Sequence, residues 1–341
     1  MRLLSRHDLL RLLLLFGLGV WLGDGTAVAE PLPARHEQAA TSPSEASPSS
    51  DSPSSPAAAA EPKKRKADKS YLRLQCDAQQ RPTAMEVAIV RFQPADRSRR
   101  GPVVDLIGAV HVAEPSFFAQ LNREFAKYDA VLYELVAPEN TRPVQGRGSS
   151  GSPVSALQTG LTQLLDLQFQ LEGIDYQRPN MVHADMSPEE FSKSMRDRGE
   201  SVWTIFMKMV GYSMMKQAED PSGKSDMELL MALFDKNRAL ALKRAMAKQF
   251  QDMGGAMLVL DGPNGSTLVS ERNKKALLVL RRELKSGKRK VAIFYGAGHM
   301  ADMAKRLQND FGLKPTGTRW LLAWDMSEGK SKKAAKSRRK P

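Results

Sequence analysis

The sequence predicts an α/β fold with a central mixed sheet, built from strand, GxxH loop, helix, strand units with a helical insertion between them. Two observations support this. The segments GAVH, ending at His111, and GAGH, ending at His299, each follow a short strand-like run and precede a helical pattern. Alternation of strands with helices is typical of α/β proteins, whose sheets contain parallel strands. The chain between the two segments has mainly helical periodicity, which predicts the insertion.

The folded part begins with two strand-like runs, residues 71–75 and 85–92, separated by the polar, proline-containing stretch 77–82. Such a pattern predicts an antiparallel hairpin that enters the sheet. Residues 103–107 form the next strand-like run, which is rich in β-branched side chains and stops at Gly108.

The first GxxH segment leads into a predicted helix that starts around Pro115. Large apolar side chains then recur at helical spacing: Phe117, Phe118, Leu121 and Phe125. A strand over residues 130–136 completes the unit. Units of this kind normally make a right-handed crossover between parallel strands.

The second unit repeats the order with a strand over 291–295, a helix over 300–311 and a closing strand over 319–324. The insertion spans about residues 152–257, and Pro188 after Ser187 marks a helix start within it. Its stretch 202–215 is rich in methionine, and we expect these side chains to fill the core: Met207, Met209, Met214 and Met215.

Residues 1–29 have the features of a secretory signal peptide. Arg2 and Arg6 precede an apolar stretch over 12–22, and residues 27–29 form an A-x-A cleavage pattern. We therefore expect an exported protein, periplasmic or secreted. The alternative is a signal that stays uncleaved and anchors the chain in the membrane.

The composition of the linker and of the C-terminal tail predicts no folded structure in either segment. Residues 30–69 are rich in Ser, Pro and Ala, as in disordered linkers, and the tail 327–341 is basic, which leaves 70–326 as the folded domain. Seven Lys and Arg residues of the tail supply more than half of the net charge of +13. The folded part is thus only mildly basic, and we expect no specific nucleic-acid site. The tail either contacts an anionic surface or simply aids solubility.

Several kinds of chemistry lack their sequence signals. Cys76 is the only cysteine, so neither an intrachain disulfide nor a cysteine metal site can form, and we expect a buried thiol. The chain contains no P-loop, no serine nucleophile elbow and no HExxH helix. Nucleotide chemistry and serine hydrolysis are therefore unsupported.

The histidines are the main candidates for chemistry. Of five, His7 lies in the signal and His36 in the linker, so the folded domain has only His111, His183 and His299. A single GxxH histidine could simply cap or pack beside a helix. Two at the ends of matched strands predict a shared site, because ligands of open α/β sheets gather at the carboxyl ends of strands. Neutral imidazoles there can bind a divalent metal, and we expect each glycine to permit an unusual backbone conformation.

Four polar residues extend this candidate site. Glu134 lies within an otherwise apolar strand, so a buried carboxylate there needs a metal or an arginine, unless it is an exposed edge residue. His183 and Asp185 are possible additional ligands, although Asp185 could instead belong to a helix cap. Arg272 could bind an anionic intermediate or be an ordinary surface arginine.

The chain resembles the TraB/PrgY/GumN and Tiki family. Its matching segments are LIGAVHVA over 106–113, YELV over 133–136, SERN over 270–273 and FYGAGHMADM over 294–303. The resemblance implies a fold related to the erythromycin-esterase and ChaN-like group, and metal-dependent proteolysis as in the Tiki branch. It places His111, Glu134 and His299 at the positions of the family's histidines and acidic residue, and Arg272 at its recurring arginine. Residues 167–187 do not align with the Tiki proteases, so substrate choice does not carry over.

These observations together predict a metal-dependent hydrolase, most simply a peptidase acting on a peptide or protein. His111, His299 and Glu134 would hold the metal, and Arg272 and Glu134 would act in catalysis. Ligands of this kind suit Mn, Co, Fe or Zn alike. The alternative is a non-catalytic extracytoplasmic protein that sequesters a peptide, haem or metal. No pattern in the sequence indicates an oligomeric state.

Overall fold

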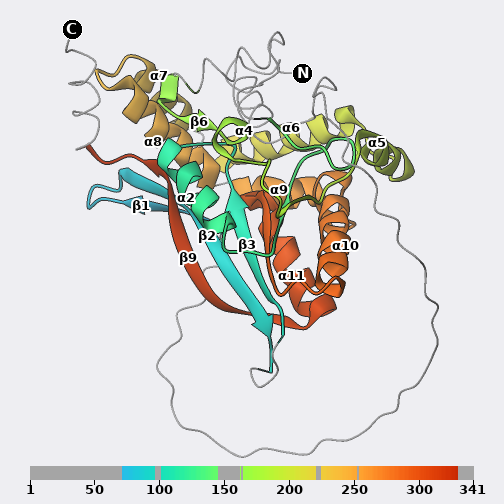
Figure 1. Ribbon diagram of the computed structural model, residues 1–341. Coiled ribbons are helices and arrows are strands. Elements are labelled where there is room, and N and C mark those ends of the chain that lie inside the picture. The colour runs from blue at the N-terminus through green and yellow to red at the C-terminus, as the bar shows by residue number, and fades with distance from the viewer. Residues whose placement is uncertain are drawn as a thin grey trace, which may run out of the picture. The chain divides into compact units, whose positions relative to one another are not determined.

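A computed structural model describes residues 71–96, 101–144, 162, 164–219, 224–251 and 253–328 (Figure 1). The expected signal peptide, the linker and the basic tail from residue 329 onward lie outside these described residues. Within the described ranges, no helix combines the length and the apolar character that crossing a membrane requires.

The centre of the fold is a mixed sheet of seven strands, which confirms the predicted fold class. Its strands are β1 (Leu72–Cys76), β2 (Pro82–Pro94), β3 (Val103–Ala109), β5 (Ala130–Tyr133), β7 (Met181–His183), β8 (Lys290–Gly296) and β9 (Leu313–Asp325). The order is β1-β2-β3-β8-β5-β7, with β9 also paired to β2. β1 and β2 form the expected antiparallel hairpin.

The parallel part of the sheet consists of β3, β8, β5 and β7. β8 lies between β3 and β5, so the two strands of the first predicted unit are parallel without being neighbours. Consequently the end of β8, which carries the second GxxH segment, lies between the ends of β3 and β5.

Nine α-helices surround the sheet in the described part of the chain. They are α2 (Pro115–Phe125), α4 (Gln170–Gly173), α5 (Pro188–Asp197), α6 (Val202–Glu219), α7 (Lys224–Leu233), α8 (Arg238–Gln251), α9 (Met253–Asp261), α10 (Arg272–Lys285) and α11 (Met300–Phe311). A π-helical turn, η1 (Thr267–Glu271), precedes α10, and a 3-10 turn, η2 (Ala297–His299), precedes α11.

Alternating side chains of the strands build two separate cores, one on each face of the sheet. Val131 and Tyr133 of β5 join a cluster with side chains of α2 and α8. Ala130 and Leu132 join a second cluster with α10 and α11, which lie next to each other in Figure 1. This period of two follows from the pleat of a strand, and it gives three layers with the sheet in the middle.

Local signals place the helix ends as the sequence predicts. Pro115 occupies the first turn of α2. Ser187 and Glu190 form a capping box at the start of α5. Gly312 ends α11 in the left-handed conformation, with a φ of 64°, where a side chain would cost energy.

The segment expected to be a helical insertion also contributes strands. β7 is part of the central sheet, and β6 (Gln168–Phe169) pairs with β4 (Val112–Ala113) directly after the first GxxH segment. The closing strand of the second unit also differs from expectation, because β9 is longer than predicted and pairs antiparallel with β2. β9 cannot pair with β8, because β8 already has β3 and β5 as its two neighbours. β9 pairs with β2 instead.

Two expectations about burial are wrong. Of the four methionines expected in the core, Met209 is buried, whereas Met207, Met214 and Met215 are exposed on α6. Cys76, expected to be buried, is exposed at the end of β1. In both cases the amino-acid type predicts an average burial, while the position of the element in the fold sets the actual value.

Candidate active site

The two GxxH segments leave the sheet side by side. β3 and β8 are parallel neighbours, and their register pairs Ala109 with Gly296 at the carboxyl ends. His111 follows β3 by two residues, and His299 lies at the end of the 3-10 turn that follows β8. The structure therefore brings both histidines to the same edge of the sheet.

The glycines of these segments serve close packing. None of Gly108, Gly296 and Gly298 has a positive φ, so the expected unusual backbone conformation is absent from both segments. A Cβ on Gly108 would lie 2.5 Å from Cγ1 of Val87, and one on Gly298 would lie 2.6 Å from Cγ of Met257. The strand of the first segment and the loop of the second thus approach neighbouring side chains too closely for alanine.

Replacing Gly108 with alanine is therefore expected to lower the free energy of unfolding by about 1–3 kcal/mol, the usual cost of overpacking. Urea denaturation of the full chain measures this change. Gly317→Ala is the matched control, because Gly317 also lies in a strand and has open space around its Cα. Equal stabilities of the two variants would contradict the packing explanation.

Glu134 connects the strand ends to helix α10. β5 ends at Tyr133, so Glu134 lies one residue beyond the strand that was expected to contain it. Its Oε1 accepts a hydrogen bond from Nη2 of Arg272 at 2.7 Å, and its Oε2 accepts one from the backbone N–H of Gly296 at 2.6 Å. The side chain is only 11% exposed, which makes an arginine partner necessary for an ionised carboxylate.

Arg272 is held by a second carboxylate, Asp185. Nε and Nη2 of Arg272 donate to the two oxygens of Asp185 at 3.0 and 2.6 Å, a two-bond contact. The Asp185 side chain is fully buried, and its Oδ1 also accepts the backbone N–H of Met186. Asp185 therefore positions Arg272, while the cap of the following helix is Ser187. Nη1 of Arg272 makes no hydrogen bond to a described residue.

Nearby charges hold the pKa of Glu134 low. Burial alone would raise this pKa, but the Arg272 charge, the two histidines and the Gly296 N–H together lower it to about 2. Glu134 is therefore a carboxylate at any pH near neutrality. A group with such a low pKa is a weak proton acceptor and a good ligand for a positive charge.

His299 is buried beside this carboxylate. Its Nε2 lies 3.5 Å from Oε1 of Glu134, and its Nδ1 lies 2.8 Å from Oδ1 of Asn273. Burial lowers the pKa of His299 below 6.5, although the Glu134 carboxylate acts in the opposite direction. At neutral pH the ring is thus uncharged and can accept a proton or bind a metal.

His111 has a similar electrostatic setting. Burial lowers its pKa below 6.5, and the effects of the Glu134 carboxylate and the Gln170 side chain, which raise it, are smaller. Its backbone carbonyl accepts the N–H of Gln170 at 2.8 Å, which fixes the start of α4 against the first GxxH segment. Within the described residues, both histidines of the site are therefore neutral bases next to one permanent carboxylate.

Gln170 brings an unpaired oxygen to the site. Its side-chain amide donates to the hydroxyl of Tyr176 at 2.9 Å, and the side chain also interacts with the His111 ring, which raises the pKa of His111. Its buried Oε1 has no partner of ordinary hydrogen-bond geometry in the described structure. A buried carbonyl oxygen without a partner costs about 1–3 kcal/mol. Such an atom beside His111 is suited to accept a hydrogen bond from a ligand or to coordinate a cation.

His183 is directed away from this cluster. Its Nε2 lies 2.6 Å from the backbone carbonyl of Leu135, and its ring packs against that of Tyr133. No contact in the described structure joins His183 to His111, Glu134 or His299. The structure thus brings five expected site residues together and leaves His183 outside the group: His111, Glu134, Asp185, Arg272 and His299.

The expected metal ligands are not spaced to bind an ion in the described structure. Among the described residues, no cluster of three His, Cys, Asp or Glu side chains has the spacing to hold an ion. Both oxygens of Glu134 already accept hydrogen bonds, one from Arg272 and one from Gly296. Only His299 Nε2 and Glu134 Oε1 face each other directly.

Two residues of the site were missed by the sequence analysis. Asn273 follows Arg272 in the SERN segment, and this adjacency in the first turn of a helix could have indicated it. Gln170 had no local signal, because its role depends on the pairing of β6 with β4.

No protein-family model, curated protein or solved structure matches the chain.

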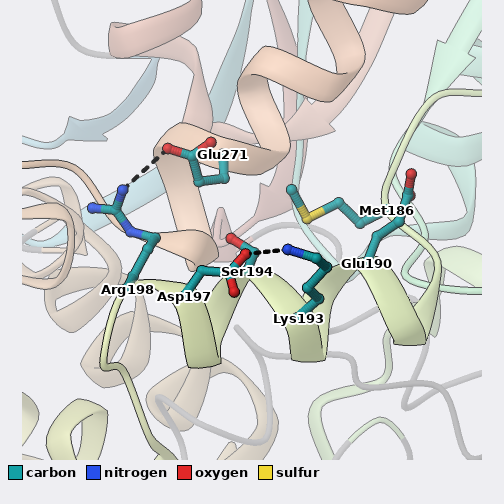
Figure 2. A pocket seen from close by; sticks show the side chains of 7 residues that line it. All are labelled: Met186, Glu190, Lys193, Ser194, Asp197, Arg198 and Glu271. Atoms are coloured by element: carbon teal, nitrogen blue, oxygen red, sulfur yellow. Dashed lines mark hydrogen bonds and ion pairs between the residues drawn. The ribbon is translucent and has the colours of Figure 1, made fainter.

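A separate open pocket of about 360 Å³ lies along α5 and contains none of the histidines (Figure 2). Figure 2 shows two ion pairs among its lining side chains, Lys193 with Asp197 and Arg198 with Glu271. Their atoms lie 2.5 and 3.2 Å apart, and the lining Glu190 pairs with Lys275 instead. The histidine cluster is the better candidate for chemistry, because it combines uncharged imidazoles with a buried carboxylate.

Proposed function

We propose that the chain is a metal-dependent hydrolase whose site is formed by His111, Glu134, His299 and Arg272. One observation carries the proposal: Nε2 of the uncharged His299 faces Oε1 of the permanently charged Glu134 at 3.5 Å. This distance is longer than an ordinary N–H···O hydrogen bond of about 2.7–3.2 Å. Two electron-pair donors directed at each other favour a cation between or beside them.

The donor atoms suit a divalent ion. His299 Nε2 and Glu134 Oε1 would be its first ligands. His111 would be the third and would have to move towards them, since no three such side chains of the described residues have the spacing to hold an ion. Imidazole, carboxylate and carbonyl donors are compatible with Mn, Co, Fe or Zn. When bound, such an ion lowers the pKa of a water molecule and polarises a carbonyl group.

The remaining residues would orient the substrate and stabilise charge. Arg272 is fixed through Nε and Nη2, which leaves Nη1 to donate to the oxygen that gains negative charge during hydrolysis. Asp185 keeps the guanidinium in place. Glu134, with its pKa of about 2, is a ligand and not a general base, which revises the catalytic role expected for it.

Peptide bonds are the proposed substrate class, on the basis of the resemblance to the Tiki branch. Export is proposed from the signal-like residues 1–29, and contact of the tail with an anionic surface from its basic charge; both segments lie outside the described residues.

The test combines metal content with turnover. Full-length protein is purified, its bound metals are measured, and cleavage of a peptide library is followed with added Mn²⁺, Co²⁺, Fe²⁺ or Zn²⁺. We expect one ion per chain, and a fall in kcat/KM of at least about 100-fold in His111→Ala and in His299→Asn. Asparagine at 299 retains a donor for Asn273 and removes only the group at Nε2.

His183→Gln is the matched control, since His183 is also half-buried but bonds a backbone carbonyl outside the site. It should retain metal and activity. A parent protein that binds none of the four ions at neutral pH would overturn the proposal. Stoichiometric metal without cleavage of any peptide would identify a binding protein instead.

A further inference from the structure

Asn273, in the first turn of α10, is fully buried. Its side chain contacts the backbone carbonyl and the ring of His299 and the carboxylate of Asp302. Its Nδ2 lies 2.8 Å from Oδ2 of Asp302 and 3.3 Å from the backbone carbonyl of His299. Both partners are oxygen acceptors, so only the NH₂ group of the amide can satisfy them. The orientation of the amide is therefore fixed, and its Oδ1 faces Nδ1 of His299 at 2.8 Å.

An amide oxygen carries no hydrogen and can only accept. The hydrogen between Oδ1 of Asn273 and Nδ1 of His299 must therefore belong to the ring. In the uncharged imidazole only one nitrogen is protonated, so Nε2 keeps its lone pair. This nitrogen is the one that faces Glu134.

We propose that Asn273 is a positioning residue that holds His299 in the tautomer with its proton on Nδ1, so that an unprotonated Nε2 faces Glu134. In the opposite tautomer, Nε2–H would donate to the Glu134 carboxylate and occupy the place of a ligand. By holding the proton on Nδ1, Asn273 leaves Nε2 of His299 free to bind a metal ion. The assignment of the tautomer follows from the hydrogen-bond geometry of Asn273 in a ring that burial keeps uncharged, whereas its use in metal binding rests on the proposed function.

The fixing of the amide extends to α11. Asp302, which accepts from Asn273, also accepts from Nε of Arg306 at 2.6 Å, one helical turn further along. This pair lies at the partly exposed end of the chain of contacts. Arg306 thus orients Asp302, Asp302 orients Asn273, and Asn273 sets the tautomer of His299.

His183 provides an internal comparison. Its Nε2 lies 2.6 Å from the carbonyl oxygen of Leu135, which can only accept, so this ring must carry its proton on Nε2. The two rings therefore differ in the nitrogen that must carry a proton, Nδ1 in His299 and Nε2 in His183.

Long-range ¹H–¹⁵N correlation spectra of the metal-free, full-length protein at about pH 8 distinguish these tautomers. We expect the protonated nitrogen of His299 to be Nδ1 and that of His183 to be Nε2. The His299 signals are identified by their absence from His299→Asn. A proton on Nε2 of His299 in the parent protein would overturn the proposal.

Substitution of Asn273 tests its role directly. Asn273→Ala should lose the fixed tautomer of His299, while His183 keeps its own and reports an intact fold. If Asn273→Ala kept the parent tautomer, Asn273 would not be the group that sets it.

The metal affinity is measured separately. Asn273→Ala should raise the Kd of the ion by about 10–100-fold, as for other groups that orient a ligand. Parent-like tautomers combined with no metal binding would count against the proposed function and leave the tautomer assignment in place.

Discussion

Replacing Arg272 with alanine is expected to lower the free energy of unfolding by about 3–5 kcal/mol, the usual cost of removing one partner from a buried ion pair. Arg272 is the only described cation in contact with the buried carboxylates of Glu134 and Asp185. Without it both carboxylates would remain in a region from which water is largely excluded. Urea denaturation of the full chain, fitted to a two-state transition, measures the loss.

Arg282→Ala provides the control on the same helix, because the Arg282 side chain is 68% exposed. We expect that variant to differ from the parent by less than about 0.5 kcal/mol. Arg272→Lys should fall between the two, because lysine cannot make the two-bond contact with Asp185. A loss below about 1 kcal/mol in Arg272→Ala would contradict the buried ion-pair network.

The stability of the protein is also expected to fall as the pH is lowered from about 4.5 to 2. The folded-state pKa of Glu134 is about 2, against an ordinary value of 4.5. Between these values the unfolded chain binds more protons than the folded one, so the stabilisation is complete above 4.5 and is lost on acidification. A depression of this size corresponds to roughly 3 kcal/mol.

Comparison of the parent with Glu134→Gln isolates this contribution. Unfolding free energies measured at several pH values should converge as the pH approaches 2, since glutamine does not titrate. Glu219→Gln is the control, because Glu219 is 59% exposed, and its pH dependence should follow that of the parent. A constant difference between the parent and Glu134→Gln across the range would show that Glu134 has no depressed pKa.

The sequence alone determined the local elements. Short runs of apolar and β-branched residues predicted the strands, and Pro115 and Ser187 marked helix starts. The matched strand ends predicted that His111 and His299 lie together. These features depend on residues close in the chain, where periodicity directly indicates which face is buried. The unusual Glu134 could be recognised for the same reason, since its apolar neighbours implied burial.

Only the tertiary structure decided how the site residues are paired. Arg272 and Asp185 are 87 positions apart, and Glu134 and Gly296 are 162 apart, so their contacts depend on the strand order β3-β8-β5. The sequence likewise showed the glycine of the first GxxH segment, Gly108, but only the fold shows that Val87 packs too closely for a larger residue there.

The local sequence pattern thus predicted the positions of His111 and His299, whereas their protonation state depends on contacts between distant segments. Burial makes His111 and His299 uncharged, Arg272 keeps Glu134 ionised, and Asn273 orients the ring of His299. Local sequence determines which residues reach the end of a strand. Protonation depends on desolvation and on nearby charges, and these are set only when distant segments pack together.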